Sequence, residues 1–140
     1  MTKILVATAL TALGLWGLSL STPASSGTVD LHADSIAYAN SEVDAGFSLE
    51  NTTGQAVSVR VVVGHYDSGG ELVATLYDQT YQVSGSSYSG SVEGLQPVSP
   101  LDGDWFRLDV YGVGYDPINT GDDALWVNAG GIDDPAGPWA

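Results

Sequence analysis

Apolar and polar residues alternate with a period of two over most of the chain. The segment EVDAGFSLE shows this most clearly, because every second residue is apolar and the residues between are charged or small. This alternation is typical of a β-strand with one buried face and one solvent-exposed face, and a helix would not sort these residues onto one side. The residues predicted to face inward are Val43, Ala45, Phe47 and Leu49.

Other segments follow the same pattern between short runs of turn-forming residues. They are VDLHADSIAYA, VSVRVVVGHY, ELVATLYDQTYQV, a short stretch at 91–93, WFRLDVYGV and ALWVNA. In WFRLDVYGV the alternation sets Phe106, Leu108 and Val110 inward. The residues left facing outward are Trp105, Arg107, Asp109 and Tyr111. About seven strands at this spacing, with no convincing helix among them, indicate an all-β antiparallel sandwich.

The segments between the strands carry turn chemistry. NTTG follows the strand that ends near Glu50, and YDSGG follows the next strand. In YDSGG, Gly69 and Gly70 are expected to supply the positive φ angles of a tight turn. GSSYSG marks a further reversal of the chain.

The first 26 residues have a different pattern. Lys3 is followed by an apolar run over 4–20 and then by a small, polar segment. This is the three-part layout of an export signal. As a helix the run would reach about 26 Å, which is also at the short end of what spans a membrane. With Lys3 before the run and an acidic sequence after it, the rest of the chain is predicted to lie outside the cell.

Two uses of this N-terminal segment stay open. Thr22 and Ala24 form a small-x-small cleavage site, which favours removal as a signal peptide. Alternatively, small residues on one helical stripe would let retained helices approach closely in an apolar setting. That stripe consists of Ala7, Thr11, Gly14 and Gly17. We therefore expect a hydrophobic helix over 1–26, serving as filament core, anchor or signal peptide, and a β-domain with an acidic C-terminal tail over 27–140.

Charge and cysteine content narrow the possible partners. The chain has 17 acidic and 3 basic residues, and since Lys3 lies in the N-terminal segment, the remainder carries 17 acids against two arginines, about −15. Such a surface repels nucleic acid and anionic membranes. Many Asp residues with almost no Lys favour a halophilic source, where salt screens the repulsion between carboxylates. The absence of cysteine excludes disulfides and thiolate metal sites.

About half of the β-domain resembles a known module. The run GFSLENTTGQAVSVRVVVGHYDSGGELVAT, followed later by WFRLDVYG, is similar to the immunoglobulin-like FxLYD and CARDB-type domains of prokaryotic surface proteins. The matching residues are Asn51, Thr53, Gly54, Tyr66, Asp67 and Gly70. The resemblance implies an immunoglobulin-like β-sandwich with an accessory, adhesive or spacer role, and it carries over no catalytic residue.

The order of parts resembles an archaeal type IV pilin, in which apolar helices bundle in the filament core and β-domains form the outer sheath. This resemblance implies a non-enzymatic, adhesive subunit of an extracellular filament. Its partners would be copies of itself, and residues 4–20 would hold it in the membrane before assembly. The alternative is an exported or membrane-anchored monomeric module that binds carbohydrate or a protein partner.

Two loops contain candidate modification or metal sites. Asn51-Thr52-Thr53 has the form of a glycosylation acceptor, expected to be exposed at a hairpin tip, although Asn and Thr also form turns through side-chain hydrogen bonds. The loop DPINTGDD clusters oxygen donors that suit Ca²⁺ but match no established calcium loop, so a solvated acidic loop is the alternative. The donors are Asp116, Asn119, Asp122 and Asp123. No other cofactor is expected.

The remaining candidates are two histidines and an aromatic face. His32 and His65 are the only imidazoles, and the chain has neither a Gly-x-Ser-x-Gly nor a His-Glu-x-x-His motif, so we predict that it is not an enzyme. His65 falls in phase with the inward valines and is predicted to be a partly buried packing residue. Three outward residues of one strand combine aromatic rings with a cation and are expected to contact a neighbouring subunit or a ligand. These residues are Trp105, Arg107 and Tyr111.

Overall fold

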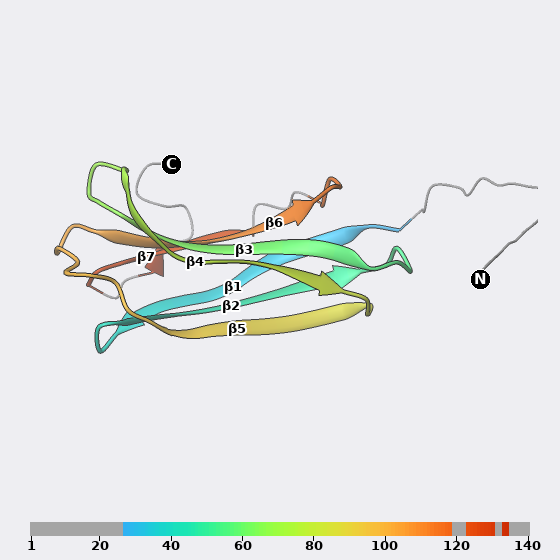
Figure 1. The fold of residues 1–140 in the computed structure, drawn as a ribbon, viewed down its shortest axis with the longest axis horizontal. Helices are drawn as coiled ribbons and strands as arrows, with labels where there is room; N and C mark the ends of the chain where they lie inside the picture. Colours follow the sequence, from blue (N-terminus) through green and yellow to red (C-terminus); the bar gives the residue numbers. More distant parts are fainter. Residues whose placement is uncertain (1–26, 119–122, 131–132, 135–140) are drawn as a thin grey trace, which may run out of the picture.

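A computed structural model describes residues 27–118, 123–130 and 133–134 of the chain (Figure 1). Every regular element in these ranges is a β-strand. The strands are β1 (Val29–Ala39), β2 (Glu42–Asn51), β3 (Val57–Tyr66), β4 (Leu72–Val83), β5 (Ser87–Leu95), β6 (Trp105–Val113), β7 (Ala124–Asn128) and β8 (Asp133–Asp134). The hydrophobic helix predicted over 1–26 and most of the acidic tail lie outside the described residues.

The strands form two antiparallel sheets that pack face to face (Figure 1). One sheet has three strands in the order β1-β2-β5, and the other has five in the order β4-β3-β6-β7-β8. The prediction of an all-β antiparallel sandwich is confirmed. The chain changes sheets between β2 and β3, between β4 and β5, and between β5 and β6. The NTTG segment at the end of β2 therefore connects two sheets and is not a hairpin tip.

The core lies between the sheets and consists of the residues that the alternation placed inward. On β2, the exposed fraction of Val43, Ala45, Phe47 and Leu49 is 3% or less, and on β6 Phe106 and Leu108 have no exposed surface. Each buried Val, Leu or Phe side chain contributes about 1.5 to 3 kcal/mol relative to the exposed side chain. Most of the stability of this cysteine-free domain therefore comes from burial of the apolar side chains that the period-two pattern turns inward.

Two local predictions differ from the structure. The short strand expected at 91–93 is the longer β5, because pairing with β2 extends it through a Ser- and Gly-rich segment whose propensity for strand is low. In YDSGG, only Gly70 has a positive φ, of 90°. The turn closes instead through the Asp67 carboxylate, which accepts hydrogen bonds from the N–H groups of Gly69 and Glu71 at 2.9 Å each.

The strand directions give the sandwich two ends of different composition. The described chain begins at Gly27, at the end that also carries the β2–β3 and β4–β5 connections, and we call this the proximal end (Figure 1). In the sequence, no charged residue lies between Glu50 and Arg60 or between Asp78 and Glu93. These two stretches include the β2–β3 and β4–β5 connections and all of β5 up to Val92, so this part of an otherwise acidic molecule is uncharged, although the loop after β6 at the same end carries Asp116.

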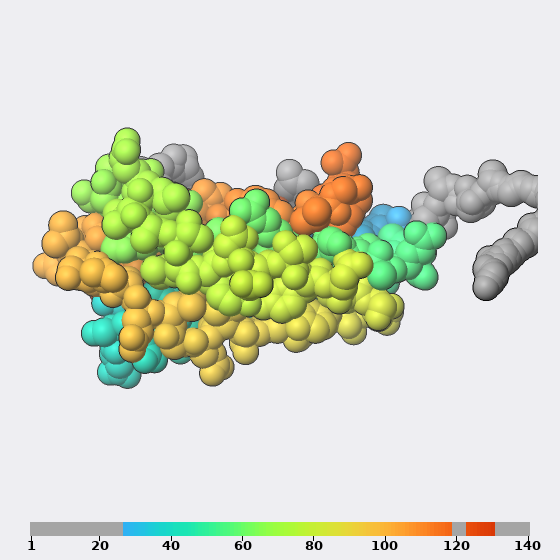
Figure 2. All heavy atoms as spheres, viewed as in Figure 1, coloured from blue at the N-terminus to red at the C-terminus, as the bar shows by residue number. Residues whose placement is uncertain are grey.

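The margin of the sandwich at β4 and β5 is closed by aromatic rings. The Phe47 ring centroid lies 5.4 Å from that of Tyr81 on β4 and 6.0 Å from that of Tyr88 on β5. Figure 2 shows β4 and β5 (yellow-green and yellow) side by side along this margin. Gly90 of β5 pairs with Phe47, and a Cβ atom at Gly90 would lie 2.6 Å from Cζ of the Phe47 ring. Glycine at this position therefore makes room for the ring.

We predict that Gly90→Ala lowers the free energy of unfolding by about 1 to 3 kcal/mol, because the added methyl group overpacks the site of Phe47. Chemical denaturation at constant pH and salt measures the change. The matched control is Ser91→Ala on the solvent face of the same strand, which should change stability by less than about 0.5 kcal/mol. Equal stability of wild type and Gly90→Ala would show that the Phe47 ring moves freely.

Candidate functional site

The outer surface of the five-stranded sheet contains the three residues predicted to contact a subunit or ligand. Strand β6 alternates as expected, so Trp105, Arg107 and Tyr111 point away from the core. Pairing between β3 and β6 sets Tyr66 opposite Trp105 and Arg60 opposite Tyr111. Tyr111 is the most exposed of the predicted residues, at 46%. We call this surface the arginine face; its residues are Arg60, Tyr66, Asp78, Trp105, Arg107, Asp109, Tyr111 and Trp126.

Arg60 is held by the neighbouring edge strand. Its Nε and one terminal nitrogen donate hydrogen bonds of 2.8 and 2.7 Å to the two carboxylate oxygens of Asp78 on β4. This two-point contact lowers the pKa of Asp78 and raises that of Arg60, in each case mainly through the hydrogen bonds. Both side chains are exposed, so the pair orders the surface more than it stabilises the fold.

Arg107 is held by an aromatic ring and an acid. Its guanidinium carbon lies 4.7 Å from the centroid of the Trp126 ring on β7, a cation–π contact. Its Nε lies 2.7 Å from Oδ1 of Asp109. Asp109, predicted to face solvent, is only 5% exposed because Arg107 and the surrounding strands cover it. Burial raises the pKa of Asp109 above its ordinary value, while Arg107 acts in the opposite direction.

Each arginine of the arginine face is therefore paired with an acid. Arg60 and Arg107 are the only basic residues after Lys3, and both lie on this one face with an acid beside each. Neither guanidinium is free to attract an anion without giving up its partner. The chemistry that remains is that of aromatic rings beside cations that are already paired, which suits contact with another large surface.

A buried His–Asp pair that the sequence did not reveal lies below this face. His65 Nε2 is 2.7 Å from Oδ2 of Asp104, and the side chains are 2% and 5% exposed. His65 was predicted to be partly buried; it is almost completely buried, because its ring packs 5.0 Å from the Phe106 ring and pairs with an acid. Its Nδ1 is buried without a hydrogen-bond partner among the described residues.

Asp104 connects three parts of the fold. Its Oδ2 also accepts a 2.9 Å hydrogen bond from Leu101 N–H, and its backbone oxygen accepts one from Ala129 N–H after β7. Burial raises the pKa of Asp104, but the hydrogen bonds from Leu101 and His65 outweigh it and leave the pKa below its ordinary value. The pair thus acts as a clasp between β3, the β5–β6 loop and the end of β7.

The remaining sequence candidates do not form a common site. Asn51 is 3% exposed, so the expected exposure at a hairpin tip is wrong: the residue lies under the sheet-to-sheet connection. Its Nδ2 donates to Gln55 O at 2.7 Å, and its Oδ1 accepts from Thr53 N at 3.0 Å and from Thr53 Oγ1 at 2.6 Å. The turn interpretation of Asn-Thr-Thr accounts for these contacts, and glycosylation stays a prediction.

The calcium candidates are only partly described. Asp116 is exposed in the loop after β6, and Asp123 is half-buried before β7. Asn119 and Asp122 lie outside the described residues, as does the stripe formed by Ala7, Thr11, Gly14 and Gly17. Among residues 27–118, 123–130 and 133–134, no group of three or more His, Cys, Asp or Glu side chains is placed to hold a metal ion. Calcium binding therefore stays a prediction.

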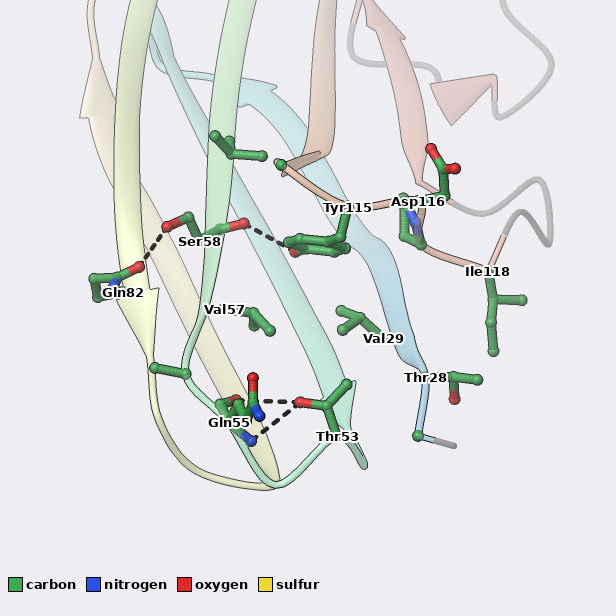
Figure 3. A pocket seen from close by; sticks show the side chains of 15 residues that line it. Thr28, Val29, Thr53, Gln55, Val57, Ser58, Gln82, Tyr115, Asp116 and Ile118 are labelled. Carbon is green, nitrogen blue, oxygen red and sulfur yellow. Dashed lines mark hydrogen bonds between the residues drawn. The ribbon is translucent and has the colours of Figure 1, made fainter. Parts of the chain in front are cut away.

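A pocket of about 510 Å³ opens at the proximal end (Figure 3). Val29, Val57 and the Tyr115 ring provide apolar surface, and the Tyr115 hydroxyl donates a 2.9 Å hydrogen bond to Ser58 O. The polar residues that line it are Thr28, Thr53, Gln55, Ser58, Gln82 and Asp116. With a single acid and no base, the lining offers mainly neutral donors and acceptors.

Comparisons with known proteins do not assign the chain to a family: no family model matches it, and no curated protein is significantly similar to it. In the part of the chain that the structure describes, no helix is long and apolar enough to cross a membrane.

We predict that Asp104→Ala lowers the free energy of unfolding by about 2 to 4 kcal/mol, because it removes the hydrogen-bond partner of the buried His65 ring and of the part-buried Leu101 N–H. Asp102→Ala in the same loop is exposed and should change stability by less than about 0.5 kcal/mol. Thermal unfolding of both variants measures the difference.

The same pair predicts a pH dependence. Because the folded-state pKa of Asp104 is lowered, its contribution is complete above the ordinary Asp value of about 3.9 and is lost as pH falls through the folded-state pKa. The stability difference between wild type and Asp104→Ala should therefore shrink as pH falls below about 4. A difference that does not vary with pH between 7 and 3 would show that the carboxylate is not needed in its charged form.

Proposed function

We propose that the chain is a non-enzymatic structural subunit of an extracellular, adhesive filament, in which retained N-terminal helices pack in the core and acidic β-domains lie outside. The observation that carries the proposal is the arginine face. The β-domains, which we call heads, carry a charge of about −15 each and repel one another. A surface on which both arginines are already paired with acids, beside exposed rings such as Tyr111, is where such heads meet with least repulsion.

Strand order supports an immunoglobulin-like assignment within this proposal. Immunoglobulin sandwiches place strands A, B and E in one sheet and C, F and G in the other, and some add a strand beside C. Here β1-β2-β5 and β4-β3-β6-β7 follow this arrangement, with β4 beside β3. This agrees with the resemblance to FxLYD and CARDB-type surface domains, whose roles are accessory or adhesive.

The N-terminal segment supplies the second part of the proposal. Residues 4–20 would hold the subunit in the membrane before assembly, and the stripe that includes Gly14 and Gly17 would let helices of neighbouring copies pack closely. Because the described chain begins with Gly27 at the proximal end, the β-domains would project from the core with their distal loops outward. Repeated contacts of this kind between copies give a filament when the rotation does not close.

The second candidate is an exported or membrane-anchored monomer that binds carbohydrate or a protein partner. The observation in its favour is the proximal pocket, because hydroxyl and amide groups around an aromatic ring suit a neutral sugar better than an ion. A calcium ion near Asp116 would belong to this alternative.

N-terminal analysis and electron microscopy of native material test the choice. The filament proposal expects a start in or before the 4–20 run and fibres of uniform width. A start near Ser25 together with monodisperse small particles would support the pocket-binding monomer and contradict the filament.

The arginine face can be tested by a charge variant. We predict that Tyr111→Glu lowers the yield of fibres, because it adds a carboxylate to the surface where heads meet. Val98→Glu adds the same charge at an 84% exposed loop position and should leave the yield unchanged. Equal yields for both variants would place the contact between heads elsewhere.

A further inference from the structure

The edges of the two sheets are not equally protected against pairing with another chain. Natural edge strands avoid such pairing through bulges, charges, shortness or cover. β1 has an irregularity at Asp34, and Ile118 N–H donates to Val29 O at its start. β4 has two irregularities in its pairing with β3 and carries Asp78. β8, in the five-stranded sheet, has two residues, both acidic.

β5 lacks these devices over Ser87–Val92. The segment contains no charge and no proline, and its pairing with β2 is regular from Glu50 to Ala45. The irregularity of this strand lies beyond Val92, where Gly94 donates to the Asp44 carboxylate. Figure 2 shows the strand along one long margin of the molecule. Ser87–Val92 is the longest stretch without these devices among the described edge strands, since the corresponding stretch of β4 is confined to Gln79–Val83.

The hydrogen-bond register identifies the groups on the free edge. Asn51 N–H donates to Ser86 O at 2.8 Å, so these paired residues are a hydrogen-bonded pair of the β2–β5 ladder. Hydrogen-bonded and non-bonded pairs alternate along an antiparallel ladder. The N–H and C=O groups of Ser87, Ser89 and Ser91 therefore point away from β2, to the free edge.

We infer that β5 pairs antiparallel with β5 of a second copy, about a two-fold axis at Ser89, and joins two three-stranded sheets into one. This register sets Ser89 against Ser89 and Ser87 against Ser91, so that every outward backbone group of the three serines finds a partner. It also sets Tyr88 against Gly90 of the second copy, an aromatic ring over an edge glycine, which is a stabilising cross-strand pair.

The charge distribution favours a second copy of the chain as the partner that pairs with the β5 edge. Two heads of like charge approach most easily through an uncharged strip, and the stretch between Asp78 and Glu93 is the longest uncharged part of the chain after residue 28. The strip is also self-complementary, since its serines pair with serines. This contact is separate from the arginine face and from the N-terminal helix, and it does not depend on the proposed filament.

Single-cysteine variants of the full chain test this pairing, because the wild type contains no cysteine. In the proposed register, the Cα atoms of the two Ser89 residues lie about 5.5 Å apart, within the range that a disulfide spans. Those of the two Ser87 residues lie more than about 13 Å apart. In detergent solution under mild oxidation, Ser89→Cys should form dimers about tenfold faster or more than Ser87→Cys, because pairing raises the effective concentration of the thiols.

Second substitutions in the Ser89→Cys chain separate strand pairing from association through the helices. Ser91→Glu faces Ser87 of the second copy and should slow dimer formation, whereas Gln79→Glu adds the same charge on β4 and should not. Equal dimer rates for Ser89→Cys and Ser87→Cys, or equal effects of the two Glu substitutions, overturn the inference. If native material forms fibres but Ser89→Cys forms dimers no faster than Ser87→Cys, the β5 pairing is overturned and the filament proposal stays intact. If Ser89→Cys forms dimers faster but native material contains no fibres, only the filament proposal is overturned.

Discussion

Val59, Val61 and Val63 occupy the inner face of β3 and have no exposed surface. Because side chains alternate along a strand, a shift of β3 by one residue would expose these valines and turn Arg60 and Val62 toward the core. Burial of the valines therefore fixes the register of β3 with both β4 and β6. The same register sets Arg60 opposite Tyr111 and within reach of Asp78. The arrangement of the arginine face is thus a consequence of packing on the opposite side of the sheet.

The inward positions could be predicted from sequence because they depend on local alternation alone. Phe47, Leu49, Phe106 and Leu108 were all placed correctly for this reason. Sheet pairing depends on which strands meet in space, so the contact between Arg107 and Trp126 had no local signal. The clasp between His65 and Asp104 was missed for the same reason, since the two residues are 39 positions apart.

Loop geometry was predicted less well where hydrogen bonds from side chains, and not the φ and ψ preferences of the residues, set the shape of the loop. Asp67 closes its turn through its carboxylate, so Gly69 needs no positive φ. Asn51 was expected at an exposed tip because its motif resembles a hairpin connection. The chain instead crosses between sheets there, and the Asn51 amide satisfies backbone groups that the crossing leaves without strand partners. In both cases, hydrogen bonds over a few residues decided the outcome.

Acidity shapes this molecule by leaving few surfaces on which two copies can approach. Every strand from β1 to β8 except β3 and β7 carries at least one carboxylate, but β5 carries none before Glu93. Salt shortens the range of the repulsion to about 3 Å at 1 M. At that range, the β5 edge and the paired arginines of the arginine face would be the surfaces that meet in the two proposed contacts between copies.

The position of the two arginines also bears on proteolysis. Trypsin-like proteases cleave after lysine or arginine, and from residue 27 onward the chain offers them only Arg60 and Arg107. Both lie within β3 and β6, neighbouring strands of the larger sheet with partners on either side. A protease must bind its substrate as an extended segment, so cleavage requires one of these strands to leave the sheet, which costs a large part of the stability of the fold. The β-domain should thus resist cleavage by proteases of this specificity for as long as it stays folded.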